Sequence, residues 1–205
     1  MKKHLYRNGD MKDLGILKIV PTKTRQLIYK LDPETYQHCC RLSLLAKAFS
    51  KFLQLSNQET QLLMWGAYFH DIGKVFISPN ILHKPTALDL EEWGIMKLHP
   101  MIDNTDLHLP EELETIIPII QCHHERWDGS GYPYGLCKEE IPHLARIVQI
   151  LDIYEALTHK RSYKPAFSPL VAIAIIQEEA RKGWYQPLLI EQIVEFVYSS
   201  HTDHR

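Results

Sequence analysis

Apolar residues recur at helical spacing through most of the chain, and this pattern predicts a helical protein. The predicted helices cover residues 32–55, 56–70, 88–98, 110–124, 141–155, 168–183 and 188–198. Asp32 suits a helix cap before Pro33, and Ser56 with Glu59 forms a capping box. Pro118 should kink or divide its helix. No segment shows a strong strand pattern, so we predict an all-α helical bundle.

The chain of 205 residues is long enough for one domain with its own core. We expect residues 1–31 to form a short N-terminal arm, residues 32–199 the helical domain, and residues 200–205 a polar tail. Residues 78–85 should form a loop with one helical turn, and glycine and proline predict a loop at 127–135.

Composition narrows the possible partners and the cellular location. The net charge of −2 shows no basic excess for a nucleic-acid polymer, and no apolar run approaches the roughly 20 residues that span a bilayer. The four cysteines lack CxxC spacing, so we read them as reduced thiols of a cytoplasmic protein. A homodimer is compatible with these features.

Twelve histidines are many for a chain of this length. The adjacent pair His70-Asp71 is the first candidate for a metal site. It ends a largely apolar helix, and a buried carboxylate requires partners or a metal ion. Similar groups occur on other predicted helices or at their ends: His38, His99, His123, His124 and Asp152. Imidazole and carboxylate ligands together suit divalent ions such as iron, manganese, zinc or magnesium. Two adjacent ions can activate a water and stabilise the leaving oxygen of a phosphoryl transfer.

Each of these residues also has an ordinary interpretation. A lone His-Asp pair is usually a surface contact or a cap, and His38 could be a core histidine bonded to a carbonyl. His99 could be a cation at a helix end, and His123-His124 could be solvated. Their occurrence together on separate helices favours the metal site.

Several motifs carry a resemblance to a known family. The matching segments are His70-Asp71-Ile72-Gly73-Lys74, Met96-Lys97-Leu98-His99-Pro100, His123-His124-Glu125, Gly131-Tyr132-Pro133 and Asp152-Ile153-Tyr154-Glu155. Over about residues 32–185 the chain resembles the HD-GYP domains, a branch of the HD superfamily of metal-dependent phosphohydrolases. The resemblance implies a helical bundle of the HD-GYP type that hydrolyses cyclic di-GMP to the linear dinucleotide, to GMP, or to both.

The resemblance also implies roles for particular residues. The implied metal ligands are His38, His70, Asp71, His99, His123, His124 and Asp152, with Glu34 as the extra carboxylate of members that hold three metals. Two or three iron or manganese ions are expected. Asp71 is the expected bridging ligand, and both Asp71 and Lys74 are implied in catalysis. Lys74, Arg161 and Lys164 should contact the substrate phosphates.

Two departures from the family pattern stand out. Met101-Ile102-Asp103-Asn104 replaces a glycine that often follows the His-Pro pair, and Asp103 could alter substrate access. Glu155 stands where the family usually has Asp. Three alternatives remain open: a phosphohydrolase acting on another cyclic dinucleotide or nucleotide, a signalling module with weak or lost turnover, and a di-iron oxygenase.

Overall fold

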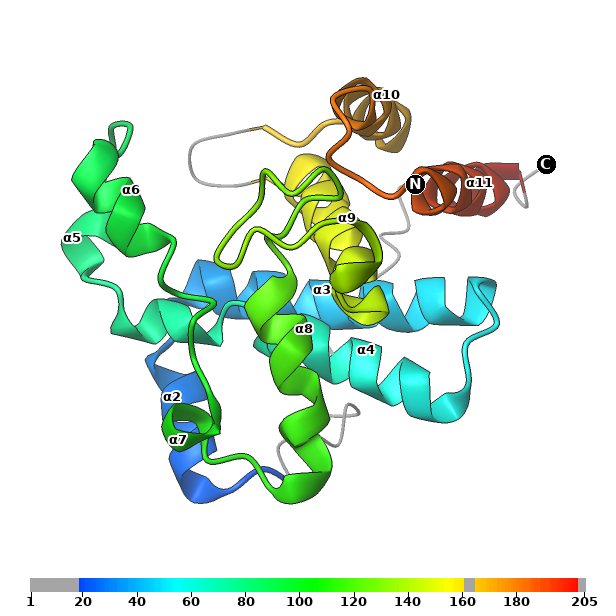
Figure 1. Ribbon diagram of the computed structural model, residues 1–205. Helices are drawn as coiled ribbons and strands as arrows, with labels where there is room; N and C mark the ends of the chain where they lie inside the picture. The colour runs from blue at the N-terminus through cyan, green and yellow to red at the C-terminus, as the bar shows by residue number, and fades with distance from the viewer. Residues whose placement is uncertain (1–18, 161–164, 203–205) are drawn as a thin grey trace.

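The computed structural model describes residues 19–160 and 165–202, and within these ranges every regular element is helical (Figure 1). The predicted all-α class is therefore confirmed. Of the residues predicted to contact the substrate, Arg161 and Lys164 lie outside the described residues. No helix among the described residues is long and apolar enough to cross a membrane.

The centre of the fold is a pair of helices, α3 (Pro33–Phe52) and α4 (Asn57–Phe69), which run side by side (Figure 1). Both start where the sequence predicts. The side chain of Asp32 accepts hydrogen bonds from two backbone amides of α3, each 3.0 Å long. Ser56 and Glu59 form the predicted capping box of α4. These local signals fix the ends of the two helices that carry the first candidate ligands.

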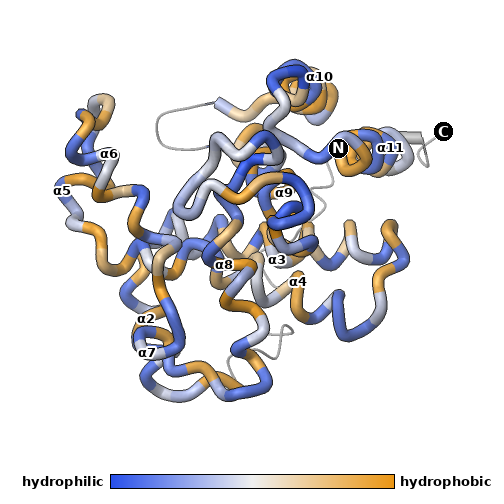
Figure 2. Tube along the Cα trace, viewed as in Figure 1, coloured by the Kyte–Doolittle hydropathy of each residue, from blue (hydrophilic) through white to orange (hydrophobic). Residues whose placement is uncertain are grey.

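Two further helices, α8 (Ile117–Cys122) and α9 (His143–Thr158), pack on this pair. A 3₁₀ helix, η3 (Glu111–Ile116), precedes α8, so the helix predicted at 110–124 is divided, with Pro118 in the first turn of α8. Apolar and polar residues alternate along these helices (Figure 2). Their apolar faces meet in a core that includes the fully buried Phe49, Leu63 and Ile147.

The remaining elements surround these four helices. They are α2 (Thr22–Lys30), η2 (Ile72–Phe76), α5 (Pro79–Leu82), α6 (Leu90–Met96), α7 (Asn104–Leu107), η4 (Lys138–Glu140), α10 (Pro169–Ala180) and α11 (Pro187–Thr202). In Figure 1, α5 and α6 project to one side of the bundle. Asp103, which we expected near the substrate entrance, caps α7 by accepting a 2.7 Å bond from the Thr105 amide.

Described helices extend beyond the bounds predicted for the helical domain on both sides. Within the predicted arm, α2 buries Ile28 in the core, and the Thr24 hydroxyl donates to the carbonyl of Leu107 at 2.8 Å. At the other end, α11 extends to Thr202, into the predicted polar tail. The helix continues there without an apolar pattern to indicate it.

The cap of α3 gives a direct test of these local signals. Asp32→Ala should lower the free energy of unfolding by about 0.5–2 kcal/mol, because two amides lose their acceptor. Asp32→Asn keeps an acceptor oxygen and should stay close to the wild type. Urea unfolding curves of the two variants measure the difference, and equal losses would show that the cap contributes nothing specific.

Candidate metal centre

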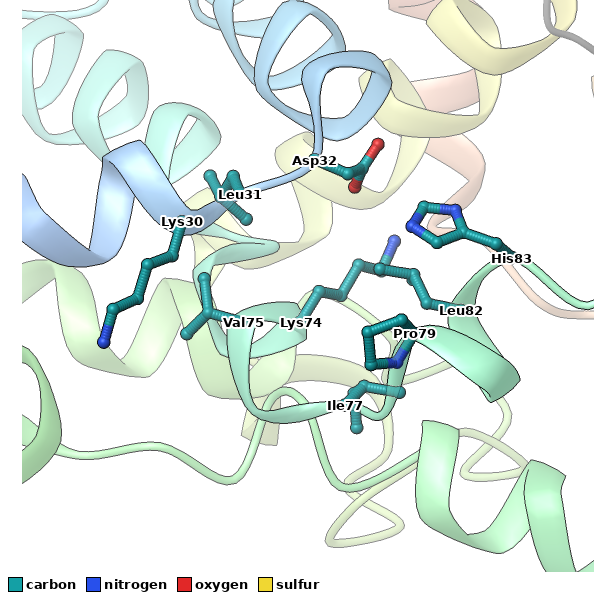
Figure 3. A pocket seen from close by; sticks show the side chains of 9 residues that line it. All are labelled: Lys30, Leu31, Asp32, Lys74, Val75, Ile77, Pro79, Leu82 and His83. Atoms are coloured by element: carbon teal, nitrogen blue, oxygen red, sulfur yellow. The ribbon is translucent and has the colours of Figure 1, made fainter.

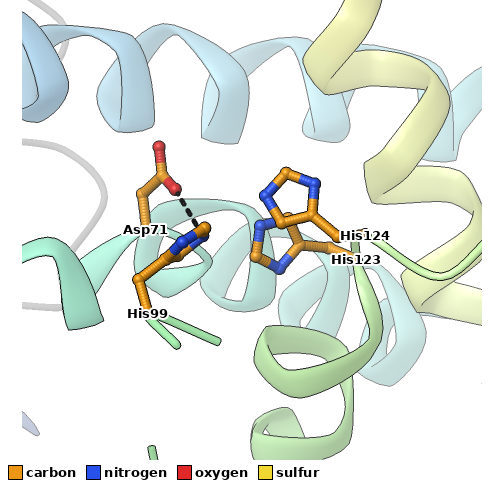
Figure 4. Close-up of side chains that lie close together, drawn as sticks. All are labelled: Asp71, His99, His123 and His124. Atoms are coloured by element: carbon orange, nitrogen blue, oxygen red, sulfur yellow. Dashed lines mark ion pairs between the residues drawn. The ribbon is translucent and has the colours of Figure 1, made fainter. Parts of the chain in front are cut away.

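The predicted ligands other than Glu34 lie in two adjacent groups. The first contains Asp71, His99, His123 and His124, and the second contains His38, His70 and Asp152. Within each group the ligand atoms lie within 4.8 Å of one another. Figure 4 shows the first group, with the carboxylate of Asp71 facing the ring of His99.

These side chains come from separate parts of the bundle. His38 is on α3, His70 and Asp71 follow the end of α4, and Asp152 is on α9. His99 follows α6, and His123-His124 follow the end of α8. Glu34 is exposed on α3, one turn before His38, and belongs to neither group.

Three histidines share one hydrogen-bond arrangement. The Nδ1 atoms of His70, His99 and His123 lie 2.8, 2.8 and 2.6 Å from backbone carbonyls three residues earlier. A carbonyl only accepts, so each Nδ1 carries a proton, and in the neutral ring each Nε2 then carries a lone pair. Among the described residues, these three buried Nε2 atoms have no hydrogen-bond partner.

The lone pairs also face a carboxylate. Nε2 of His70 lies 3.3 Å from Oδ2 of Asp71, and Nε2 of His99 lies 3.2 Å from Oδ1. These distances would suit an ion pair. In a neutral ring that is protonated at Nδ1, however, Nε2 and the carboxylate oxygen are both acceptors and repel each other. A divalent cation between them removes the repulsion and supplies each atom with a partner. The donor set therefore fits a metal ion.

The electrostatics keep the ligands of the first group in their binding forms. Burial lowers the pKa of His124 to about 3 and that of His123 well below its usual value, and the neighbouring histidines act in the same direction. Burial alone would raise the pKa of Asp71, but the ammonium of Lys74 holds it well below its usual range. His123 and His124 are therefore neutral, and Asp71 is ionised.

The second group has a different proton arrangement. Nε2 of His38 lies 2.9 Å from Asp152, and Nδ1 lies 2.5 Å from Glu155. Burial opposes protonation of His38, but the bonds to the two carboxylates outweigh it and raise the pKa to about 9. Protonated His38 thus bridges Asp152 and Glu155. A metal ion bound to His38 and Asp152 would take the place of the Nε2 proton.

Cys39 also lies close to this centre. It forms a third group with His70 and Asp71, and its Sγ is 4.0 Å from Nδ1 of His70. Burial raises the pKa of the Cys39 thiol well above its usual value. A protonated thiol is a poor ligand, so the two histidine–carboxylate groups are the stronger candidates.

Lys74 connects the first group to an adjacent pocket. Its ammonium donates to Oδ2 of Asp71 at 2.6 Å. Burial alone would lower the pKa of Lys74, but Asp71 raises it above the usual value, so the ammonium stays charged. The side chain also lines a pocket of about 150 Å³ with Asp32 and His83 (Figure 3). A positive charge therefore lies between the candidate centre and this opening.

The loop after His124 is held by buried contacts. The carboxylate of Glu125, fully buried, accepts bonds from the amides of Tyr134 and Leu136 at 2.7 and 3.1 Å. The ring of Tyr132 stacks on that of His124, with centroids 4.7 Å apart. Gly131 is required here, because a Cβ would lie 2.3 Å from the Arg126 amide nitrogen. The Gly-Tyr-Pro segment thus packs directly against a candidate ligand.

Sequence reasoning missed one side chain of this region. Arg41 donates from Nε to Glu155 at 2.5 Å. It follows His38 by three residues on α3, as Glu155 follows Asp152 on α9. Residues at this spacing share a helix face, so the spacing is the signal that could have indicated the contact.

Comparison with known families and curated proteins agrees with this geometry. The family model described as "HD domain" matches residues 24–189. A cyclic di-GMP phosphodiesterase of Vibrio cholerae is 39% identical over 175 residues, covering 78% of this chain and 35% of its own length. A 3'3'-cGAMP-specific phosphodiesterase 2 of the same organism is 32% identical, and the match covers 94% of this chain and 38% of that protein. This chain therefore spans well under half the length of these two relatives.

Solved structures show the same fold. Bd1817, an HDG"Y"P protein from Bdellovibrio bacteriovorus, matches with a TM-score of 0.61 and 21% identity, covering 82% of this chain and 52% of that one. The HD domain of the phosphodiesterase PgpH from L. monocytogenes, in complex with cyclic-di-AMP, matches with a TM-score of 0.59 and 20% identity. That match covers 88% of this chain and 98% of the other.

The position of His99 depends on a close contact with Gly73, which can be tested. A Cβ at Gly73 would lie 1.9 Å from the backbone oxygen of His99. Gly73→Ala should therefore displace His99, lower the free energy of unfolding by about 1–3 kcal/mol and reduce bound metal. Thermal unfolding and elemental analysis measure the two effects.

Gly94→Ala is the matched control, because no atom lies within 4 Å of the added Cβ. Gly94 is inside a helix, where alanine is favoured by about 0.5–1 kcal/mol. Wild-type metal content in Gly73→Ala would contradict the role of this contact.

Proposed function

Because this chain belongs to the HD domain family, we propose that it is a metal-dependent phosphodiesterase that hydrolyses cyclic di-GMP to the linear dinucleotide, to GMP, or to both. The observation that carries the proposal is the pair of adjacent donor groups that meet at His70 and Asp71. Two donor groups in contact suit two ions, and paired ions are the usual arrangement for hydrolysis of a phosphodiester. The names of the curated relatives support the substrate class.

We propose that Asp71 bridges two ions, because its two oxygens face His70 and His99 from opposite groups. Iron or manganese suits the mixture of imidazole and carboxylate ligands. Such ions lower the pKa of a water molecule and stabilise charge on phosphate oxygens. Glu34, one turn before His38 on α3, is the proposed ligand of a third ion.

The chain's cations supply the remaining part of the proposed site. Lys74 is held beside Asp71 and faces the pocket, so its ammonium can hydrogen-bond a substrate phosphate at the edge of the centre. Arg161 and Lys164 are proposed to neutralise other phosphate oxygens, on the basis of the family resemblance alone. We also propose a cytoplasmic location, which the reduced cysteines favour.

A second candidate substrate is another cyclic dinucleotide. One curated relative is specific for 3'3'-cGAMP, and one structure of the same fold is a complex with cyclic-di-AMP. Hydrolysis assays with the three cyclic dinucleotides, on protein loaded with manganese or with iron under anaerobic conditions, separate these possibilities. Preferred turnover of cyclic di-GMP supports the first proposal, and absence of turnover on all three would contradict both.

Asp71→Ala should abolish hydrolysis and lower the metal content, because it removes the carboxylate common to both donor groups. Removal of metal from the wild type with a chelator should give the same loss, and added manganese should reverse it. The control is Glu191→Gln, which changes an exposed carboxylate on α11. Full activity with normal metal content in Asp71→Ala would refute the proposed centre.

Lys74→Gln should lower kcat by about 10²-fold while the bound metal stays at the wild-type level, because the variant loses a charged donor to phosphate but no ligand. Steady-state kinetics and elemental analysis on the same preparation test this. Lys51→Gln, at an exposed position in the last turn of α3, serves as the control. Unchanged kcat in Lys74→Gln would remove this residue from the proposed site.

A further inference from the structure

Two helices of the candidate centre are joined by a short ladder of charged side chains. His38 and Arg41 lie one turn apart on α3, and Asp152 and Glu155 lie one turn apart on α9. His38 contacts Asp152 at 2.9 Å and Glu155 at 2.5 Å, and Arg41 contacts Glu155 at 2.5 Å. The ladder therefore fixes how the ligand-bearing faces of α3 and α9 meet.

Glu155 has the central position in this ladder. Only 1% of the residue is exposed, and its two carboxylate oxygens bind different partners. Oε2 accepts from Nδ1 of His38, and Oε1 accepts from Nε of Arg41. Nδ1 of His159 also lies 3.3 Å from Oε1. A buried carboxylate with charged donors on both oxygens is firmly oriented.

His38 differs from the three histidines whose Nδ1 atoms face backbone carbonyls. Its Nδ1 faces the carboxylate of Glu155, and this leaves Nε2 directed at Asp152. A carboxylate that accepts the far N–H of a histidine fixes the ring orientation and makes the other nitrogen a stronger metal ligand. The Nδ1 atoms of His70, His99 and His123 are held by backbone carbonyls, which a mutation cannot remove. Nδ1 of His38 is held by a side chain, which a mutation can change.

We propose that Glu155 is a positioning residue for the group formed by His38, His70 and Asp152, and that Arg41 holds Glu155 in place for this task. The pair sets the affinity of the ion in this group and leaves the ion beside His99, His123 and His124 unaffected. The proposal rests on the metal centre of the proposed function, but it concerns ion binding and not the choice of substrate.

The carboxylate is required because it offers an acceptor oxygen to each of two donors. A glutamine at position 155 has one acceptor oxygen, for which Nδ1 of His38 and Nε of Arg41 would compete. If the amide NH₂ faces His38, Nδ1 must accept and Nε2 becomes protonated, so the ring cannot bind an ion through Nε2. Removing Arg41 in the same chain ends this competition.

The test is Mn²⁺ binding to the full chain after removal of metal. Bound Mn²⁺ per chain is measured by elemental analysis at defined free Mn²⁺, and electron paramagnetic resonance distinguishes coupled from isolated ions. The variants are Glu155→Gln, Arg41→Met and the double variant. Glu179→Gln is the control, because Glu179 accepts a bond from Tyr185 on another part of the bundle.

The wild type should bind at least two ions, and the ions of the two donor groups should be coupled. Glu155→Gln should bind the first ion normally and the second about 10–100-fold more weakly, with an isolated-ion spectrum. Arg41→Met alone should weaken the second ion by a smaller factor, whereas the same change should strengthen it in the Glu155→Gln background. The effect of Arg41→Met on the affinity for the second ion thus changes sign between the two backgrounds. Such a change is expected when His38 and Arg41 compete for one acceptor oxygen. Glu179→Gln should match the wild type.

Several results would overturn the proposal. If folded Glu155→Gln binds both ions with wild-type affinity, Glu155 has no role in ion binding. If it loses both ions equally, Glu155 has no role specific to the group of His38. If circular dichroism shows Glu155→Gln to be unfolded, Arg41→Met carries the test, and an unchanged second ion then refutes it. A wild type that binds fewer than two ions refutes the two-ion centre itself. Absent hydrolysis with two ions bound refutes only the proposed function.

Discussion

The constraint on which the structure depends is the burial of several imidazole lone pairs against one ionised carboxylate. The Nε2 atoms of His70 and His99 face Asp71 at 3.3 and 3.2 Å, and the part of the bundle that the structure describes supplies them with no proton donor. Such an arrangement is costly unless a cation occupies it. The ammonium of Lys74 donates to Asp71 at 2.6 Å, and the close approach of Gly73 to the backbone oxygen of His99 leaves no room for a Cβ there.

The two donor groups are built by different means. In the first, rigid backbone carbonyls orient His99 and His123, and burial keeps His123 neutral. In the second, side chains orient His38, which is protonated while it bridges Asp152 and Glu155. An ion bound by the second group would have to displace the Nε2 proton of His38, whereas His123 of the first group is already neutral. The two halves of one centre thus differ in how strongly ion binding depends on pH.

Local features of the fold could be predicted from the sequence, because caps and helical periodicity act within a few residues. Asp32, Ser56 and Pro118 mark helix boundaries that the structure confirms. The extension of α11 to Thr202 was missed, since its last residues carry no apolar signal. The candidate ligands could be named from residue type and resemblance. Their division into two groups depends on how several helices pack together, and the contact of Arg41 with Glu155 depends on how α3 and α9 cross; no local pattern encodes either.

The candidate ligands are far apart in the sequence. His38 and Asp152, which meet at 2.9 Å, are separated by 114 positions, the difference of their numbers. An ion held between them would act as a reversible cross-link that closes a long loop through the core, and long closed loops restrict the unfolded chain most. Resistance to unfolding and to proteolysis would then follow the supply of free metal. The same atoms that prepare the site for chemistry would make the lifetime of the folded chain a measure of its metal content.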